Sequence, residues 1–496
     1  MQDYEKEIEN FINDFNSVIN EDILKLSMDF DKFYKEQKAQ DIEILIKNAK
    51  SLLSDSLNKA SQMQIYYDIS GGYHDLRIIE NQNNENYLEN EIYYLRYVLD
   101  IYEKNYRLNS KACSELRIAK YIAMRSYTNL GNAYRAIRRY IASINCFQNA
   151  LILDESFAMA SLNLSDLLFE YAQFQIKGYE KNYFDHACYY YYSQTINYKF
   201  NLENQKYLDK LNETLSVYDK TYIKEYLTQP LNLPSFNVYN EDEYNYRIFL
   251  RLFRLFLDPC QDILSDLCFA VDSINLPFVE PLDDKQKEFV GLFNQIKQEF
   301  NWARFMWYQV SAFDVEENYP DKELDLIDVG DCADYSLKDS MMRTAFKTCY
   351  SLFDRIGFFI NEYFEIGLTE KNVNFKNVWK ENLRGRKGNI YFSIPFPIMK
   401  THFDNPFIQA MYWLQKDFYE KKEINVTAPQ AFPIFQMRND MEHNCLRTAY
   451  KQNNKSFTKY TSEGEIEQNT FQLLKLGRES IIYLCLAINY DINIKQ

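Results

Sequence analysis

The sequence predicts an all-α protein, and three features of its composition support this fold class. Only 12 of the 496 residues are Gly and 11 are Pro, whereas an average globular chain has about 7% Gly and 5% Pro. So few turn formers, in a chain with 46% hydrophobic residues, indicate long helices joined by short connections. Aromatic residues make up 17% of the chain, so the helices are expected to pack through bulky side chains. A chain of this length can hold about two to four domains.

The N-terminal helices carry the spacing of a helical repeat. In "YTNLGNAYRAIRRYIASINCFQNALILDES" (127–156), bulky and small residues occur at the positions of a tetratricopeptide (TPR) repeat, a pair of antiparallel helices. Gly131 and Ser143 are small enough for the helices to approach closely, and Tyr134 and Phe147 fill the groove between them. The same phase returns 34 residues later at Ser161, Leu164, Ser165 and Leu168. We therefore expect TPR-like repeats over residues 1–225, with the clearest repeat at 124–157.

The rest of the chain is expected to form a linker and a second helical domain. Residues 219–240 include "LTQPLNLPSFNVYN", whose two prolines indicate a linker, and residues 226–284 are expected to hold the linker and connecting helices. Residues 285–496 are expected to form a helical bundle. The predicted apolar helical segments are 243–273, 285–313, 337–369, 404–421, 434–452 and 467–488. The acidic stretch 314–331 is predicted to be a loop, and residues 371–403 a connector.

Charge is distributed unevenly along the chain. The net charge is −15, but from Tyr335 onward there are 22 Lys and Arg against 17 Asp and Glu, a net charge of +5. The first 334 residues therefore carry −20. An acidic N-terminal part followed by a mildly basic C-terminal part is compatible with a phosphate-bearing ligand at the C-terminal end.

The cysteine pattern and the hydropathy predict a cytoplasmic protein. The nine cysteines never fall in a CxxC pair, so they indicate reduced thiols and not a disulfide framework or a zinc site. The N-terminus "MQDYEKEIENF" is acidic and lacks the layout of a signal peptide. No apolar run approaches the ~20 residues that a membrane span needs. We expect no metal, no cofactor and no membrane partner.

The sequence "RNDMEH" (438–443) is the candidate catalytic motif. With 19 Arg and four His in the chain, about half a match to R-x4–6-H is expected by chance, so the spacing alone is weak. The chemistry is nevertheless suited to RNA cleavage without metal. His443 can take the 2′-hydroxyl proton or protonate the 5′-oxygen leaving group. Arg438 can hold the phosphate as charge develops, and Asn439 can orient the phosphate or the imidazole.

The position of the motif in its helix adds to this interpretation. Five residues correspond to about 140° around a helix, so Arg438 and His443 flank one edge, with Asn439 one turn before His443. A helix that begins after Pro433 would place all three residues in its first two turns, where backbone N–H groups favour an anion.

The motif and its surroundings resemble the HEPN superfamily of small helical bundles, many of which are ribonucleases. "RNDMEH" resembles the R-[polar]-x3-H motif of that superfamily. Three further segments resemble a HEPN branch that follows TPR-like repeats: "MRTAFKTCYSLFDRIGFFINEYFEIGL" (342–368), "NPFIQAMYWLQKDF" (405–418) and "FPIFQMRNDMEHNCLRTAYK" (432–451). "YNYRIFLRLFRLFLDPCQDIL" (244–264) and "FNWARFMWYQVSAF" (300–313) resemble the segments that precede this branch's bundle. The similarity spans roughly 240–496.

This resemblance implies a metal-independent endoribonuclease that leaves 2′,3′-cyclic phosphate and 5′-hydroxyl ends. By motif position Arg438, Asn439 and His443 are the catalytic residues. Such proteins usually form homodimers in which two motifs face one cleft, and the helix over 341–368 is a candidate interface. Many act in bacterial anti-phage or toxin systems, where a TPR region senses a trigger or binds a partner protein.

Several features keep a second interpretation open. Asp440 and Glu442 are either supporting residues or solvated helix charges, and the charge of Glu442 would favour a protonated His443. Arg384, Arg386 and Lys387 either contact RNA phosphates or form a solvated loop. The alternative to an enzyme is a non-catalytic interaction protein, in which the repeats bind a peptide and the bundle only dimerises or docks RNA.

Overall fold

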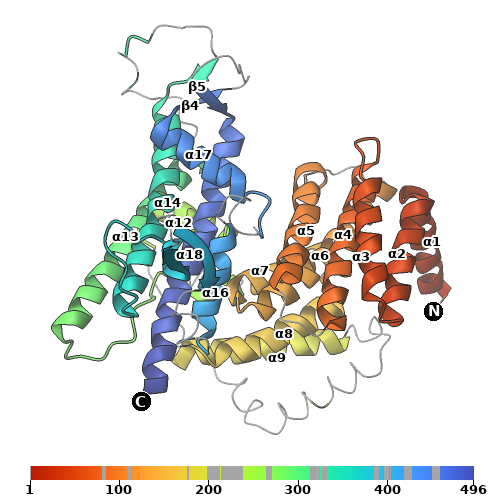
Figure 1. The fold of residues 1–496 in the computed structure, drawn as a ribbon, viewed down its shortest axis with the longest axis horizontal. Helices are drawn as coiled ribbons and strands as arrows, with labels where there is room; N and C mark the ends of the chain where they lie inside the picture. Colours follow the sequence, from red (N-terminus) through yellow and green to blue (C-terminus); the bar gives the residue numbers. More distant parts are fainter. Residues whose placement is uncertain are drawn as a thin grey trace. The chain divides into compact units, whose positions relative to one another are not determined.

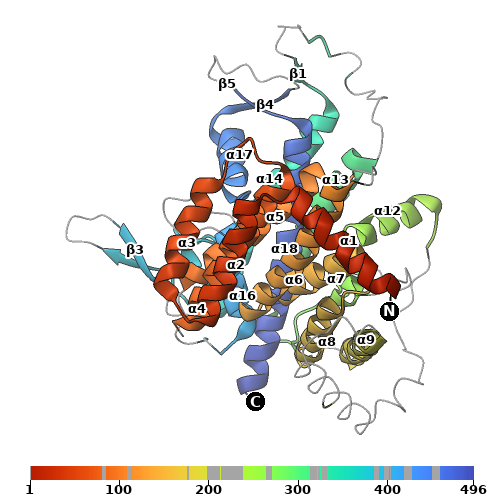
Figure 2. The ribbon, with the colours of Figure 1, turned by 90° about the vertical axis from the view of Figure 1, so that its right-hand side faces the viewer.

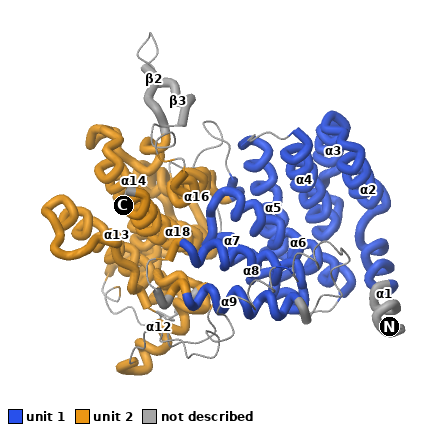
Figure 3. The backbone as a smooth tube through the Cα atoms, turned by 90° about the horizontal axis from the view of Figure 1, so that it is seen from below, with its two compact units in different colours: residues 1–173, 182–230, 421–429 blue, residues 174–181, 231–420, 430–496 orange. Residues whose placement is uncertain are grey.

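The computed structural model describes residues 2–80, 85–108, 113–175, 178–197, 213, 238–263, 271–312, 321, 324–326, 332–384, 390–395, 402, 404–417, 427–449 and 458–495. This part of the chain is mainly helical, which confirms the predicted all-α fold class. Contacts divide the chain into two compact units (Figure 3). Unit 1 holds residues 1–173, 182–230 and 421–429, and unit 2 holds residues 174–181, 231–420 and 430–496.

Unit 1 is a series of helices in chain order (Figure 1). Its helices are α1 (Gln2–Val18), α2 (Glu21–Lys35), α3 (Ala39–Leu52), α4 (Lys59–Ile79), α5 (Glu85–Asn105), α6 (Ser114–Ala136), α7 (Tyr140–Leu153), α8 (Ala158–Ala172) and most of α9 (Gly178–Asn197). From α2 to α8 each helix packs against the next, and α4 also contacts α2 and α6. The unit is therefore a helical-repeat structure, whereas its assignment to the TPR class stays a prediction.

The hairpin of α6 and α7 shows the close approach that the sequence predicts. Ser143 Oγ donates a hydrogen bond of 2.6 Å to the carbonyl of Gly131. A Cβ atom at Gly131 would lie 2.6 Å from the buried ring of Phe147. A second small residue, Ser165 of α8, lies 34 positions after Gly131 and donates to the carbonyl of Cys188 in α9 at 3.0 Å. Small residues thus set the distance between the helices of two successive pairs.

Unit 2 is a helical bundle with short strands attached (Figures 1 and 2). Its helices are α12 (Glu241–Leu252), α13 (Asp284–Ala312), α14 (Leu337–Tyr363), α16 (Pro406–Leu414), α17 (Ala431–His443) and α18 (Glu463–Lys495), with short 3-10 turns η2 (Pro259–Asp262), η4 (Asn377–Trp379) and η5 (Gln415–Asp417). Helices α13, α14 and α18 pack against one another, and α16 packs on α18. These helices form the core that carries α17.

Five strands accompany the bundle: β1 (Ala333–Asp334), β2 (Lys380–Arg384), β3 (Ile390–Pro395), β4 (Cys445–Ala449) and β5 (Thr458–Thr461). Strand β4 pairs antiparallel with β1, Ala333 opposite Ala449, and parallel with β5, Cys445 opposite Thr458. Strands β2 and β3 form an antiparallel hairpin within residues 371–403, which we expected to be an irregular connector.

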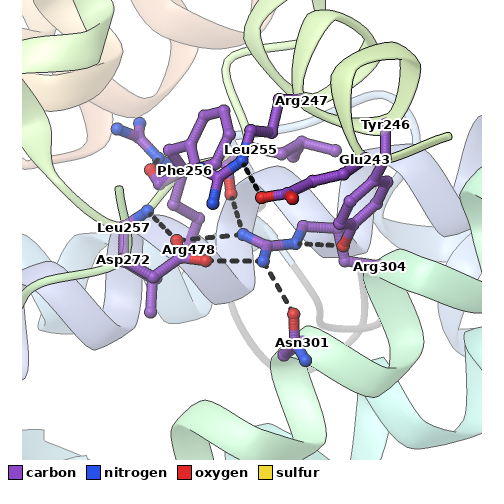
Figure 4. A network of polar contacts seen from close by, with 10 residues as sticks. All are labelled: Glu243, Tyr246, Arg247, Leu255, Phe256, Leu257, Asp272, Asn301, Arg304 and Arg478. Carbon is purple, nitrogen blue, oxygen red and sulfur yellow. Dashed lines mark hydrogen bonds and ion pairs between the residues drawn. The ribbon is translucent and has the colours of Figure 1, made fainter. Parts of the chain in front are cut away.

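The predicted helix 243–273 is wrong for residues 253–263 and 271–273, since α12 ends at Leu252, and residues 264–270 lie outside the described residues. Arg254 has a positive φ of 55°, and the chain leaves the helix there. Two buried arginines donate hydrogen bonds to carbonyl groups that would accept backbone N–H groups if the helix were longer. Arg304 Nη1 donates to the carbonyl of Leu255 at 2.8 Å, and Arg478 Nε donates to the carbonyl of Phe256 (Figure 4). Tertiary hydrogen bonds therefore replace helical ones.

Arg304 is the centre of this network. Only 1% of the residue is exposed. Its guanidinium contacts Asp272 at 2.6 and 3.1 Å and also donates to the side chains of Asn301 at 2.8 Å and Tyr246 at 3.2 Å (Figure 4). Burial acts to raise the pKa of Asp272, but the charge and hydrogen bonds of Arg304 outweigh it and hold that pKa below its usual value. The guanidinium therefore links α12, the segment that follows it and α13.

Two other predicted helices end earlier than expected. The predicted helix 337–369 ends at Tyr363, because Glu365 and Gly367 have positive φ values of 52° and 82°. The carboxamide of Asn361 then accepts the backbone N–H of Leu368 at 2.9 Å and caps the turn.

The predicted helix 434–452 ends at His443 and is followed by β4. In β4 Leu446 and Thr448 are buried and Arg447 is half-buried, which is the alternation of a strand. Thr448 Oγ1 donates to Asp339 of α14 at 2.5 Å, and Arg343 of α14 donates to the carbonyl of Leu446. Docking on α14 thus decides the strand conformation.

The remaining predicted segments agree in position with α13, α16 with η5, and α18. Most of the predicted linker 219–240 and of the acidic loop 314–331 lies outside the described residues. Within the described part of the chain, every helix is too short or too polar to cross a lipid bilayer.

Replacing Gly131 by Ala should destabilise unit 1, because the new methyl group would overlap the ring of Phe147. We expect a loss of about 1–3 kcal/mol in the free energy of unfolding, measured by urea denaturation. Gly71→Ala in α4 is the matched control, since no atom lies within 4 Å of its Cβ position. Alanine favours a helix over glycine by up to about 1 kcal/mol, so the control should be neutral or stabilising. Equal losses in both variants would contradict the close-packing explanation.

Replacing Arg304 by Ala should destabilise unit 2 by about 3 kcal/mol, because buried acceptors would lose their donor. Arg304→Lys should recover only part of this loss, since one ammonium group cannot reproduce the fork of hydrogen bonds. Arg247→Ala is the control, because Arg247 forms a partly exposed pair with Glu243 at 2.8 Å and such pairs contribute about 0–1 kcal/mol. Thermal unfolding of the three variants measures these losses in stability. A loss in Arg247→Ala as large as that in Arg304→Ala would contradict the role of Arg304.

Candidate active site

Helix α17 carries the candidate motif at its C-terminal end. The helix begins at Ala431, two residues before Pro433, and His443 is its last residue. Our expectation that the motif occupies the first two turns is therefore wrong, since Pro433 lies inside the first turn, where a missing N–H is tolerated. A helix C-terminus presents carbonyl groups, which favour cations and not anions. Side chains, and not backbone N–H groups, must hold any phosphate here.

Contacts to neighbouring helices fix the orientation of α17. Ile434 and Met437 are buried, and the sulfur of Met437 accepts a hydrogen bond of 3.8 Å from Asn469 of α18. Asn439, which is half-buried, and His443, which is exposed, lie on the opposite side of the helix, whereas the half-buried Arg438 follows Ile434 by about one turn at the border of the buried side. The helix is thus anchored by its apolar side, and His443 stays accessible at its end.

The structure brings Arg438 and His443 together. Arg438 Nη1 lies 3.5 Å from His443 Nε2 and donates to Asn439 Oδ1 at 3.2 Å. Because arginine can only donate, the contact requires a neutral imidazole with its proton on Nδ1 and a free electron pair on Nε2. That electron pair is the one a general base uses. Asn439 contacts the arginine, and so it orients the guanidinium in this arrangement.

Helix α14 supplies the surface beneath Arg438. The guanidinium carbon lies 5.7 Å from the ring centre of Tyr350, within the range of a cation–π interaction. Burial raises the pKa of Tyr350 to about 12, and the charge of Arg438 acts in the opposite direction. Burial also raises the pKa of Asp354, one turn further along α14, again opposed by Arg438. Arg438 thus lies over a neutral phenol ring and interacts with Asp354 through its charge.

Arg438 also has free hydrogen-bond donors. Its Nε and Nη2 atoms donate to no acceptor within the described residues, whereas Nη1 contacts Asn439 and His443. An adjacent pair of guanidinium N–H groups matches two oxygens of one phosphate. The exposed imidazole beside them completes a site that can bind a phosphodiester and move a proton. Among the residues that the structure describes, no three His, Cys, Asp or Glu side chains are grouped to hold a metal ion.

The two acidic residues of the motif have different environments. Asp440 is buried, so the interpretation of this residue as a solvated charge is wrong. Its carboxylate accepts a hydrogen bond of 2.7 Å from Asn444, the residue that caps α17. Glu442 is exposed and lies 3.4 Å from Lys347 of α14, in agreement with a solvated helix charge. Asp440 therefore stabilises the helix end that carries His443.

The predicted basic cluster cannot be assigned to the site. Arg384 is the last residue of β2, and nothing is established for its side chain. Arg386 and Lys387 lie outside the described residues. Their contact with RNA phosphates stays a prediction.

Sequence reasoning missed the α14 residues of the site. Lys347, Tyr350 and Asp354 recur at intervals of three and four residues, so they share one face of the helix. A polar and aromatic stripe on a predicted apolar helix is a signal that could have drawn attention to them. The sequence does not show which helix faces this stripe, and only the packing of α14 identifies Arg438 and Glu442 as its neighbours.

The comparisons with known proteins give one match, to a protein family. Residues 282–491 match the family model described as LA2681-like HEPN. This range covers less than half of the 496-residue chain and includes α13, α14, α16, α17 and most of α18. The helical bundle of unit 2 is thus a HEPN domain, and Arg438, Asn439 and His443 lie within it. No curated protein and no solved structure matches the chain.

Replacing Asp440 by Ala should destabilise the end of α17, because Asn444 would lose a short, partly buried side-chain hydrogen bond. We expect a loss of about 1–2 kcal/mol in the free energy of unfolding. Glu442→Ala is the adjacent control, and its exposed pair with Lys347 should contribute less than about 1 kcal/mol. Chemical denaturation of both variants measures the difference, and a larger effect of Glu442→Ala would contradict the assignment.

Proposed function

We propose that the protein is a metal-independent HEPN endoribonuclease, with Arg438 and His443 as its catalytic residues. The observation that carries this proposal is the 3.5 Å approach of the guanidinium to an accessible imidazole nitrogen inside a HEPN domain. HEPN domains typically act on RNA, and this pair supplies both a phosphate ligand and a proton acceptor.

The reaction begins when His443 Nε2 takes the proton from a ribose 2′-hydroxyl. The 2′-oxygen attacks the adjacent phosphorus, and Arg438 stabilises the added negative charge on the phosphate oxygens through its Nε and Nη2 donors. The bond from phosphorus to the 5′-oxygen then breaks, and a protonated histidine returns a proton to that oxygen. The products are a 2′,3′-cyclic phosphate and a 5′-hydroxyl. Asn439 keeps the guanidinium in position.

A homodimer would place two copies of the pair on one substrate, so that one His443 removes the proton and the other supplies it. We further propose that the enzyme works in bacterial anti-phage defence or a toxin system, with the helical repeats of unit 1 sensing a trigger or binding a partner protein. Both extensions rest on the resemblance to HEPN proteins with N-terminal repeats.

The proposal is tested with end-labelled single-stranded RNA and the purified full chain in excess EDTA. The wild type should produce fragments with cyclic phosphate ends. His443→Ala and Arg438→Ala should each lower the rate by about 10²–10⁴, because each removes a group that acts on the transition state. Asn439→Ala should have a smaller effect, since Asn439 contacts only the arginine.

Two matched controls separate catalysis from folding. His186→Ala removes a histidine of unit 1, and Arg355→Ala removes an arginine of α14 that pairs with Glu299 at 2.5 Å. Both should retain cleavage. Cleavage that survives both Arg438→Ala and His443→Ala would contradict the proposal. RNA binding without cleavage, both in vitro and on expression in cells, would favour the non-catalytic scaffold instead.

A further inference from the structure

Unit 1 contains a polar cavity that RNA cleavage does not explain. The cavity has a volume of about 320 Å³ and lies among α2, α4, α5 and α6. Its walls include the apolar side chains of Phe30 and Leu95, whereas most of the lining is polar. Asp31 and Asn132 are exposed at its edge. Few core cavities of a helical-repeat structure are polar without a ligand or water to satisfy the polar groups.

Asp68 of α4 is a buried carboxyl group of the lining, with 8% of the residue exposed. Its oxygens accept hydrogen bonds from two neutral donors, Ser27 Oγ at 2.6 Å and Gln64 Nε2 at 2.8 Å. No cationic side chain of the described residues forms an ion pair with it. A carboxyl in such a place lacks the partner that burial of a charge normally requires.

Asp75 lies on the same face of α4, two turns after Asp68, and its carboxylate accepts no hydrogen bond from the described residues. The neighbouring Glu91 is different. Its carboxylate pairs with Arg77 at 3.1 Å and with His74 at 3.0 Å. The hydrogen bond that His74 donates to Glu91 is the main cause that raises the pKa of His74. Glu91 is therefore paired with two basic side chains, whereas Asp75 forms no ion pair with a described residue and interacts with His74 only through its charge.

Arg125 is the cation that faces Asp68 and Asp31. Its guanidinium lies over the rings of Tyr67 at 4.7 Å and Tyr121 at 5.5 Å. It forms no ion pair with a described residue and acts on Asp68 and Asp31 only through its charge. The lining holds four carboxyl groups, Asp31, Asp68, Asp75 and Glu91, against the two side chains Arg125 and His74, so acidic groups outnumber basic ones in the cavity.

We propose that this cavity binds an aliphatic polyamine, whose ammonium groups pair with Asp68 and Asp75 and whose methylene chain lies along Phe30 and Leu95. The two carboxyl groups are seven residues apart, which corresponds to about 10 Å along the axis of α4. One metal ion cannot reach both groups, because its ligand oxygens must lie within about 2.0–2.6 Å of the ion. A linear chain with positive charges at both ends can reach both.

The titration of the two carboxyl groups supports the proposal and supplies a readout. Burial raises the pKa of Asp68 to about 7, against hydrogen bonds from Ser27 and Gln64, and raises the pKa of Asp75 to about 7 as well. Near pH 7 each group is therefore partly protonated in the free protein. A bound cation favours the ionised form, so the pKa of each group falls and protons are released on binding.

The same shifts predict how stability depends on pH in the free protein. Both folded-state pKa values lie above the value of about 3.9 for an unfolded Asp. The folded state therefore holds more protons between these values, so the contribution of Asp68 and Asp75 to stability is complete at low pH and is lost as the pH rises through about 7. Spermidine should stabilise the protein most above this range.

The experiment is calorimetric titration of the full chain with spermidine at pH 7, in two buffers with different ionisation enthalpies. We expect one binding event with release of protons and a higher melting temperature. Asp75→Asn should weaken binding about tenfold or more, since a charge-assisted contact is lost, and should reduce the proton release. Asp68→Asn should act similarly, and its melting temperature without ligand reports whether it folds. Asp55→Asn, on the exposed turn between α3 and α4, is the matched control and should bind like the wild type.

Each alternative result overturns the proposal. No binding at millimolar spermidine, or binding that neither Asp75→Asn nor Asp68→Asn weakens, would exclude this site. Equal affinity for butylamine, which has one ammonium group, would exclude the bridging of both carboxyl groups. Equal displacement by Mg²⁺ would show a divalent-cation site instead of a polyamine site. The test does not depend on RNA cleavage, so it stands or fails separately from the proposed enzyme.

Discussion

Two buried arginines of the HEPN domain determine the path of the chain in unit 2. Arg304 of α13 and Arg478 of α18 donate to the carbonyl groups of Leu255 and Phe256, and so the segment after α12 cannot continue as a helix. Their charges are balanced by carboxylates of that same segment, with Asp272 on Arg304. Removal of a guanidinium would leave several acceptors without donors in a low-dielectric place, which costs more than loss of an exposed ion pair. The positions of α13 and α18, and with them the α14 and α17 that pack on this core, depend on these contacts.

In the candidate active site, side chains would bind the phosphate, a task that backbone N–H groups perform at a helix N-terminus. Many anion sites use backbone N–H groups at a helix N-terminus, but Arg438 and His443 lie at the opposite end of α17. The phosphate would therefore depend on the guanidinium, which Tyr350 and Asn439 hold in place from two sides. The carbonyl end of the helix instead favours the protonated imidazole that forms when His443 accepts a proton. The same placement thus weakens anion binding by the backbone and assists proton transfer.

Unit 1 combines two kinds of interior that have opposite physical requirements. Around Gly131 and Ser143 the helices touch, and one extra methyl group has no room. Around Asp68 and Asp75 the helices leave a cavity in which these two carboxyl groups form no ion pair with a described residue. Close packing stabilises the repeat through apolar contact, whereas a buried charge without a partner destabilises it. A polyamine would remove that cost and would couple the stability of the repeat to the ligand.

The sequence by itself determined the helical fold class, the close contact at Gly131 and the pairing of Arg438 with His443, because these depend on composition and on spacing within one element. It did not determine where helices stop, since the contact of Arg304 with Leu255 and the docking of β4 on α14 join residues that are 49 and 109 positions apart. It also did not show Tyr350 beneath Arg438, or the shared cavity of four helices around Asp68. Such features depend on which elements become neighbours, and a single sequence shows periodicity along a helix but not the partner of its faces. Tertiary hydrogen bonds to backbone carbonyl groups decided where α12 ends and where β4 follows α17.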